Sequence, residues 1–156
     1  MSEPAVVVDI DSTLADTFHR SHMILQGDQR EDTDWVAYAK ACGGDTPTGT
    51  VDLLRLLDPY YTIVLMTSRP GAARDETVEW LTRYRVPYDV LIMDYKHAPS
   101  TVDFKVEQIR ELIRSGWDVR LLLEDNWKIG EAVKAELGVP SVIVRSYAPN
   151  KLELSF

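Results

Sequence analysis

The chain of 156 residues has little of three things, namely cysteine, long apolar runs and basic charge in its first part. Its one cysteine, Cys42, excludes an internal disulfide and fits a reducing compartment. No apolar run approaches the roughly 20 residues that a membrane-spanning helix needs. The short run at residues 6–10 also lacks the basic leader and cleavage site of a signal peptide. These absences predict a cytoplasmic protein.

Basic residues are scarce in residues 1–60, which hold four Lys or Arg against eleven Asp or Glu, within a net charge of −8 for the whole chain. Non-specific nucleic-acid binding depends on Lys and Arg that neutralise phosphates, so a field of this sign disfavours it. Any contact with a nucleic acid is therefore expected to be local and short.

The remaining composition is ordinary, with 45% apolar and 27% charged residues, and the length is that of one domain. Short apolar runs predict strands near residues 6–10, 61–66, 89–93, 119–123 and 142–144, with helical patterns between them. Strands that alternate with helices of 10 to 15 residues imply parallel pairing and right-handed crossovers. We predict an α/β fold, a Rossmann-like three-layer sandwich with a five-stranded parallel sheet, over residues 1–156.

Residues 15–47 break this regularity and are interpreted as a small, cap-like helical insertion after the first strand. Trp35, Tyr38 and Cys42 follow helical spacing before the chain reaches two glycines. Both aromatic residues could stack on a nucleobase, but their spacing favours packing of the insertion onto the core. His19 and Arg20 either contact a substrate from this insertion or are polar surface residues.

Carboxylates and a hydroxyl follow three of the predicted strands. Asp9 and Asp11 follow the first, Thr67 follows the second, and Glu124 with Asp125 follows the fourth. The carboxyl ends of parallel strands share one edge of a sheet, where such folds bind ligands. A group of acidic side chains there needs a hard cation, and ligation by oxygen alone suits Mg²⁺. The competing explanation for each site is a strand-end turn or a helix cap.

Two further features could address an anion at the same edge. Thr67, Ser68 and Arg69 precede a helix, so a hydroxyl, a guanidinium and a helix N-terminus come together. Lys105 stands in the first part of a later helix, off the predicted apolar face formed by Val102, Val106, Ile109 and Ile113. Spacing alone favours a solvated surface lysine at this position.

Taken in order, these residues resemble the four motifs of the haloacid dehalogenase (HAD) superfamily of phosphohydrolases. The motifs are Asp9-x-Asp11-x-Thr13, Thr67, Lys105 and Glu124-Asp125. Within that superfamily the chain is similar to the phosphatase domains of the bacteriophage polynucleotide kinase/3′-phosphatase type. The similarity rests on Leu14-Ala15-Asp16, His19-Arg20, Asp34-Trp35, Ser68-Arg69-Pro70, Trp80-Leu81 and Val86-Pro87-Tyr88-Asp89.

The resemblance implies an aspartyl-phosphate mechanism in which Asp9 attacks phosphorus and Asp11 protonates the leaving oxygen and then activates water. Asp11 is therefore expected to be free to carry a proton. The metal ligands implied for Mg²⁺ are Asp9, the backbone carbonyl of Asp11 and Asp125, with Glu124 orienting the waters of the metal. Thr67 and Lys105 would bind the phosphoryl oxygens. The residues implied for substrate binding are Ser68, Arg69, Arg20 and Lys96.

Three positions depart from the pattern of the relatives. Ser12 replaces a common glycine, which we expect to matter little because the position carries no chemistry. Asp94 stands where relatives often have an arginine, and we expect Lys96 to take over that contact with the substrate. Asn126 stands where the fourth motif often has an arginine.

The expected function is that of a Mg²⁺-dependent phosphomonoester hydrolase, acting as a polynucleotide 3′-phosphatase or a nucleotide phosphatase. A separate kinase or ligase partner in nucleic-acid repair would accompany the first role. The acidic charge and the missing arginine favour a small substrate, either a nucleotide or another phosphate ester. The alternatives are therefore a phosphatase for a small non-nucleotide ester and a non-catalytic module that binds a phosphate or a partner.

Overall fold

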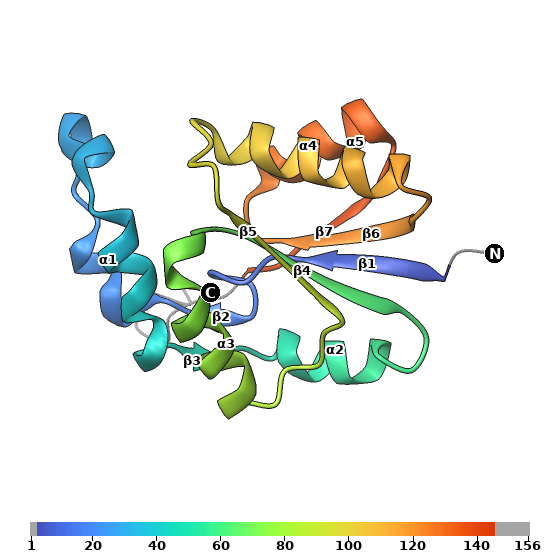
Figure 1. Cartoon of the computed structure of the whole chain (residues 1–156), viewed down its shortest axis with the longest axis horizontal. Coiled ribbons are helices and arrows are strands. Elements are labelled where there is room, and N and C mark those ends of the chain that lie inside the picture. Colours follow the sequence, from blue (N-terminus) through green and yellow to red (C-terminus); the bar gives the residue numbers. More distant parts are fainter. Residues whose placement is uncertain (1–2, 146–156) are drawn as a thin grey trace, which may run out of the picture.

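The computed structural model describes residues 3–145 and centres on one parallel sheet (Figure 1). Five strands pair in the order β5-β4-β1-β6-β7, and every pairing is parallel. The predicted α/β fold with a five-stranded parallel sheet is confirmed. The strands are β1 (Pro4–Val8), β4 (Thr62–Pro70), β5 (Val90–Asp94), β6 (Asp118–Glu124) and β7 (Ser141–Ile143).

Helices cover both faces of this sheet, so the chain forms three layers. α4 (Thr101–Arg114) and α5 (Trp127–Leu137) lie on one face, and α2 (Thr50–Leu57) and α3 (Arg74–Arg83) lie on the other (Figure 1). Gly138 ends α5 in a left-handed conformation with φ of 71°, which glycine adopts without steric cost. A short 3₁₀ turn, η4 (Gly71–Ala73), joins β4 to α3.

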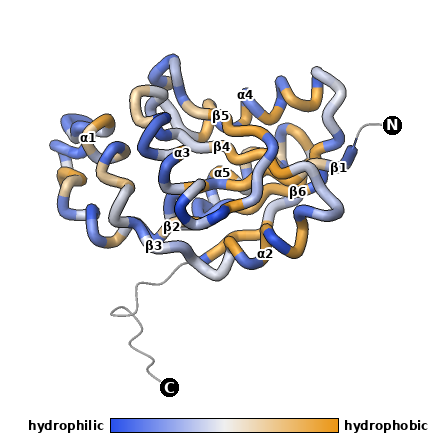
Figure 2. The backbone as a smooth tube through the Cα atoms, turned by 60° about the horizontal axis from the view of Figure 1, so that its bottom comes forward, coloured by the Kyte–Doolittle hydropathy of each residue, from blue (hydrophilic) through white to orange (hydrophobic). Residues whose placement is uncertain are grey.

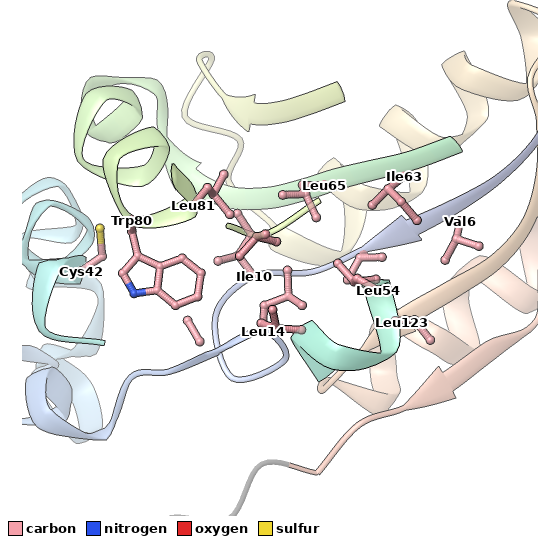
Figure 3. Packing of buried hydrophobic residues seen from close by; sticks show 14 residues of the cluster. Val6, Ile10, Leu14, Cys42, Leu54, Ile63, Leu65, Trp80, Leu81 and Leu123 are labelled. Carbon is pink, nitrogen blue, oxygen red and sulfur yellow. The ribbon is translucent and has the colours of Figure 1, made fainter. Parts of the chain in front are cut away.

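The central strand β1 supplies side chains to two separate cores. Val6 and Val8 pack with α2 and α3, in a cluster that includes Trp80 (Figure 3). Ala5 and Val7 face the opposite way, into the cluster under α4 and α5. Because both faces are covered, β1 is a continuous apolar run without alternation. Hydrophobic segments of the backbone gather along the strands of the sheet and on the helices beside them (Figure 2).

Two predicted details are wrong. The second strand does not end at residue 66, because β4 continues to Pro70, which pairs with Asp94 after a shift of register beyond Met66. Ile113 is 38% exposed instead of buried, and the inner side of α4 carries Phe104, Lys105, Val106 and Ile109. The apolar pattern therefore assigned Ile113 to the buried face of this helix and left out Phe104 and Lys105.

The predicted insertion leaves the sheet after β1 and lies beyond the carboxyl ends of the strands (Figure 1). The predicted helix is present as α1, and the Asp34 side chain caps it by accepting the Ala37 N–H. The paired two-residue strands were not predicted, since two residues show no periodicity. In order, the elements are β2 (Ala15–Asp16), η1 (Phe18–Met23), η2 (Gly27–Asp32), α1 (Trp35–Lys40), η3 (Ala41–Gly44) and β3 (Thr46–Pro47).

Within residues 3–145, each helix is too short or too polar to cross a membrane. The predicted single domain with a cap-like insertion at residues 15–47 stays an interpretation of this architecture.

Candidate active site

Three carboxylates meet where β1 and β6 end, and we call Asp9, Glu124 and Asp125 the acidic cluster. One carboxylate oxygen from each lies within 4.8 Å of the others. Asp9 directly follows β1, Glu124 is the last residue of β6, and these strands are neighbours in the sheet. Parallel pairing thus brings together residues more than 100 positions apart in the sequence. Their arrangement suits a divalent cation held by oxygen ligands.

Lys105 reaches into the acidic cluster from α4. Its Nζ donates to Asp9 Oδ1 and to Glu124 Oε2, both at 2.6 Å, and the side chain is only 2% exposed. The surface lysine favoured by spacing alone is therefore wrong, because its two partners come from other strands. Three carboxylates and one ammonium leave a formal surplus of two negative charges, which one divalent cation would neutralise.

Burial, together with the surplus of negative charge, raises the pKa values of two carboxyl groups in the acidic cluster. Burial is the main cause of a rise in the pKa of Asp9 to about 6, and repulsion from Glu124 adds to it while Lys105 opposes it. Burial and the hydrogen bond with Glu124 raise the pKa of Asp125 to about 9. Burial acts to lower the pKa of Lys105, but the negative charges of Asp9 and Glu124 outweigh it, so the pKa of Lys105 is raised above its ordinary value. The three carboxylates are thus poorly compensated without a cation.

A second group of charges surrounds Asp11, and we call Asp11, Arg20, Asp45 and Arg69 the arginine cluster. Asp11 Oδ1 accepts from Arg20 Nη2 at 2.7 Å and from Arg69 Nη2 at 2.6 Å. Asp45 accepts from Arg20 Nε at 2.8 Å and from Arg69 Nη2 at 3.3 Å. Two carboxylates and two guanidinium groups therefore balance one another in a buried network.

The arginine cluster holds Asp11 in its ionised form. Burial acts to raise the pKa of Asp11, but Arg69 first and Arg20 second outweigh it and lower the pKa to about 2. The expectation that Asp11 is free to carry a proton is thus not met in this arrangement. Arg20 and Arg69 were expected to bind substrate, yet each side chain is 1% exposed and bonded to these carboxylates. In this structure both arginines bind Asp11, and a role in substrate binding stays a prediction.

A cavity of about 630 Å³ opens over both clusters. Asp9, Asp11, Lys105, Glu124 and Asp125 line it, and Ser68 and Arg69 line it from the end of β4. The other predicted substrate-binding residues, Arg20 and Lys96, are not among its lining residues. Its volume falls in the usual range for sites that bind small molecules, about 300–1,000 Å³.

Two predicted residues lie close to this cavity without reaching it. Thr67 is buried, and its hydroxyl accepts the Arg69 N–H at 3.1 Å, so a role in phosphoryl binding stays a prediction. Lys96 is exposed beyond β5, where its N–H donates to Asp94. Asp94 also accepts the Ala98 N–H, so the acidic residue at this position shapes the loop that carries Lys96.

Ser12, which directly follows Asp11, adopts a left-handed backbone with φ of 63°. Glycine reaches this conformation without the steric cost that a serine incurs. Replacement of the common glycine therefore has a conformational consequence even though position 12 carries no chemistry, which corrects the expectation that it matters little.

Sequence reasoning missed Asp45, Thr77 and the role of Thr13. Asp45 is fully buried and its backbone carbonyl also accepts from Trp80 Nε1 at 2.9 Å. Thr77 accepts from Arg69 Nη1, and Thr13 donates to Asp9 Oδ2. Asp45 follows two glycines, where an aspartate is an ordinary turn residue. The available signal was the presence of two arginines near the motifs, which need carboxylate partners if they are buried.

The sequence matches one protein-family model over most of its length. Residues 2–130 match the family described as HAD superfamily, subfamily IIIB (acid phosphatase). A comparison with curated proteins gave no significant match.

Several solved structures share the fold. A chain in the structure of the Pnkp1/Rnl/Hen1 complex is 24% identical with a TM-score of 0.76, and the similarity covers 92% of this chain and 46% of that one. A chain of the Pnkp1/Rnl/Hen1 RNA repair complex is 25% identical with a TM-score of 0.72, covering 92% and 42%. The chain thus spans less than half the length of these two proteins.

A HAD family enzyme from Bacteroides thetaiotaomicron, in complex with magnesium and inorganic phosphate, is more distant. It is 11% identical with a TM-score of 0.55, and the similarity covers 95% of this chain and 96% of that one.

Proposed function

Because the chain belongs to the HAD superfamily, subfamily IIIB, and is a phosphatase, we propose that it hydrolyses the phosphomonoester of a polynucleotide 3′ end or of a nucleotide. The observation that carries the chemistry is the acidic cluster with Lys105 at the base of the cavity. Support for the substrate comes from the similarity to chains of the Pnkp1/Rnl/Hen1 assemblies, one of which is described as an RNA repair complex.

Mg²⁺ is the cofactor that fits the acidic cluster, because three carboxylates offer hard oxygen ligands and carry the surplus negative charge that a divalent cation neutralises. Asp9, Asp125 and the backbone carbonyl of Asp11 would hold the ion, and Glu124 would orient its waters. When bound, Mg²⁺ supplies electrostatic stabilisation of the phosphoryl oxygens. The related HAD enzyme from Bacteroides thetaiotaomicron is described in complex with magnesium and phosphate.

Asp9 is the nucleophile in this proposal. Lys105 and Thr13 fix its carboxylate from two sides, through Oδ1 and Oδ2, so that its orientation toward the cavity is set before substrate arrives. Attack on phosphorus forms an aspartyl phosphate and breaks the ester bond, and hydrolysis then releases phosphate. Lys105 and Thr67 bind the phosphoryl oxygens and offset their charge.

Asp11 is the general acid and base in this proposal, and the arginine cluster controls when Asp11 can carry a proton. A phosphoryl group that enters the cavity competes with Asp11 for the N–H donors of Arg69, which lines the same space. Loss of those donors raises the pKa of Asp11 and lets it carry the proton that the leaving oxygen requires. The first proton departs with the leaving group, and in the later base step Asp11 accepts a new proton from the water that attacks the aspartyl phosphate.

The test is phosphate release with Mg²⁺ from a 3′-phosphorylated oligonucleotide, nucleoside monophosphates and sugar phosphates. We expect kcat/KM to be highest for the oligonucleotide or a nucleotide. Preference for a sugar phosphate over both would overturn the nucleic-acid assignment in favour of a small non-nucleotide ester. If the oligonucleotide is preferred, a kinase or ligase that acts on the same ends is the partner to seek by co-purification.

A further inference from the structure

The wall of the cavity that the insertion supplies differs in chemistry from its base. Residues of the insertion that line the cavity include Ile24, Arg30, Trp35 and Tyr38, and none of the insertion's lining residues is acidic. The carboxylates at the base come from the ends of the strands and the segments that follow them. With a divalent cation on the acidic cluster the base would accept an anion, so a ligand that fits both parts has an anionic end and an apolar or aromatic end.

The two aromatic residues of α1 are placed differently. Tyr38 is buried at 9% exposure, and its ring lies 4.2 Å under the Arg20 guanidinium, so it packs the insertion onto the arginine cluster. Trp35 meets Tyr38 edge to face, with ring centroids 5.7 Å apart at 83°, and stays 38% exposed. Helical spacing favoured packing for both, which holds for Tyr38, whereas Trp35 presents indole surface to the cavity.

Arg30 adds a positive charge beside this indole. Its guanidinium lies 5.6 Å from the centre of the Trp35 ring. The other cations that line the cavity, Arg69 and Lys105, are bound to carboxylates. Within the part of the chain that the structure describes, Arg30 has no carboxylate partner, so its charge is available to an anionic ligand.

From this arrangement we propose that Trp35 is a stacking subsite for the nucleobase of the terminal nucleotide, with Arg30 facing the phosphodiester that precedes it. This inference rests on the proposed function and names the part of the substrate that the insertion binds. Stacking on an aromatic ring tolerates any base, because every base presents a π face. A sugar phosphate would leave Trp35 and Arg30 without a partner.

The experiment compares two oligonucleotides that differ only at the 3′-phosphorylated terminal residue, one with a base and one abasic. For the wild-type protein we expect kcat/KM to be about tenfold higher with the base present. Trp35→Ala should remove this difference by lowering the value for the base-containing oligonucleotide alone. Trp35→Phe should keep most of it. Tyr60→Ala, at a 74% exposed aromatic residue that does not line the cavity, is the matched control.

The abasic oligonucleotide separates loss of stacking from collapse of the insertion. If Trp35→Ala lowers kcat/KM equally for both oligonucleotides, Trp35 is a structural residue and the inference is wrong. Equal wild-type values for the two oligonucleotides would also overturn it, while the proposed phosphatase function stands. Absence of hydrolysis of either oligonucleotide by the wild-type protein, with hydrolysis of a sugar phosphate, would instead remove the proposed function on which the inference depends.

Discussion

The acidic cluster and the arginine cluster both contribute side chains to one cavity, but their charges are balanced in different ways. In the acidic cluster three carboxylates face one ammonium group, and the pKa values of Asp9 and Asp125 are raised. In the arginine cluster two carboxylates face two guanidinium groups, and the pKa of Asp11 is lowered. The first cluster needs an added cation, whereas the second is complete by itself.

This difference separates the two motif aspartates, which stand only two residues apart. Asp9 follows β1 directly and belongs to the sheet, with Lys105 and Glu124 as neighbours. Asp11 is bound by residues from β4 and from the insertion. The surroundings of the proposed nucleophile are thus supplied by α4 and β6, and those of the proposed acid and base by the insertion and β4.

The largest effect is expected from Asp9→Asn, because an amide neither attacks phosphorus effectively nor carries the charge that the cation needs. Phosphate release should fall by more than about a thousandfold. Asp52→Asn changes an exposed aspartate paired only with Arg55 and should leave the rate unchanged. Turnover by Asp9→Asn at the wild-type rate would contradict the assignment of the nucleophile.

Asp45→Asn should break the balance of the arginine cluster. Removing one partner of a buried ion pair leaves uncompensated charge, which costs about 3–5 kcal/mol of folding free energy. Asp45 is fully buried and binds both arginines, so this range applies to it. Urea unfolding measures the loss, with Asp52→Asn as the matched exposed control. An unchanged unfolding midpoint would show that Asp45 does not anchor the two arginines.

The two clusters should give stability a pH dependence of opposite sign. The folded pKa of Asp11 is about 2, below its ordinary value of 3.8, so its contribution of about 2 kcal/mol is present above pH 4 and is lost as the pH falls toward 2. Asp9 and Asp125 have raised pKa values of about 6 and 9, so without metal their ionisation destabilises the fold as the pH rises from 4 to 9.

Mg²⁺ should cancel only the second of these effects. A concentration 100 times the dissociation constant stabilises a folded protein by about 2.7 kcal/mol, and protons compete for the same carboxylates. The rise in Tm on addition of Mg²⁺ in place of EDTA should therefore be larger at pH 8 than at pH 5. Asp125→Asn should reduce that rise. A rise in Tm that is independent of pH would refute this account of the acidic cluster.

The smallest effect is expected from Lys96→Ala. Lys96 is exposed and does not line the cavity, although it was expected to replace the arginine of relatives. We expect kcat/KM to change by less than about twofold for a 3′-phosphorylated oligonucleotide. A tenfold rise in KM would restore Lys96 as a contact with the substrate.

Local pattern predicted the parts of this molecule that depend on local properties. Apolar runs gave the strands of the sheet, and carboxylates at the ends of β1 and β6 indicated the acidic cluster. Lys105 shows where such reasoning ends. Its partners Asp9 and Glu124 lie 96 and 19 positions away, and no helical pattern records them.

The burial of Asp45 was harder to predict than that of Lys105, because a buried aspartate after two glycines has the same local sequence as one in an exposed turn. Its burial follows from Arg20 and Arg69, which come from two different segments and meet only in the folded chain. Charge balance among buried groups is a property of the whole fold. It leaves no periodic pattern in the sequence from which the partners of Asp45 could be predicted.

The pairing of β2 with β3 has a consequence for how this fold can change. Ala15 pairs with Pro47, so the insertion departs from and returns to neighbouring points, as a closed loop does. The entropic cost of closing a flexible loop grows only with the logarithm of its length, by about 0.6 kcal/mol for each doubling. The sheet therefore tolerates loops of other lengths at this junction, and an exchanged loop could bring a new ligand preference without a new catalytic core.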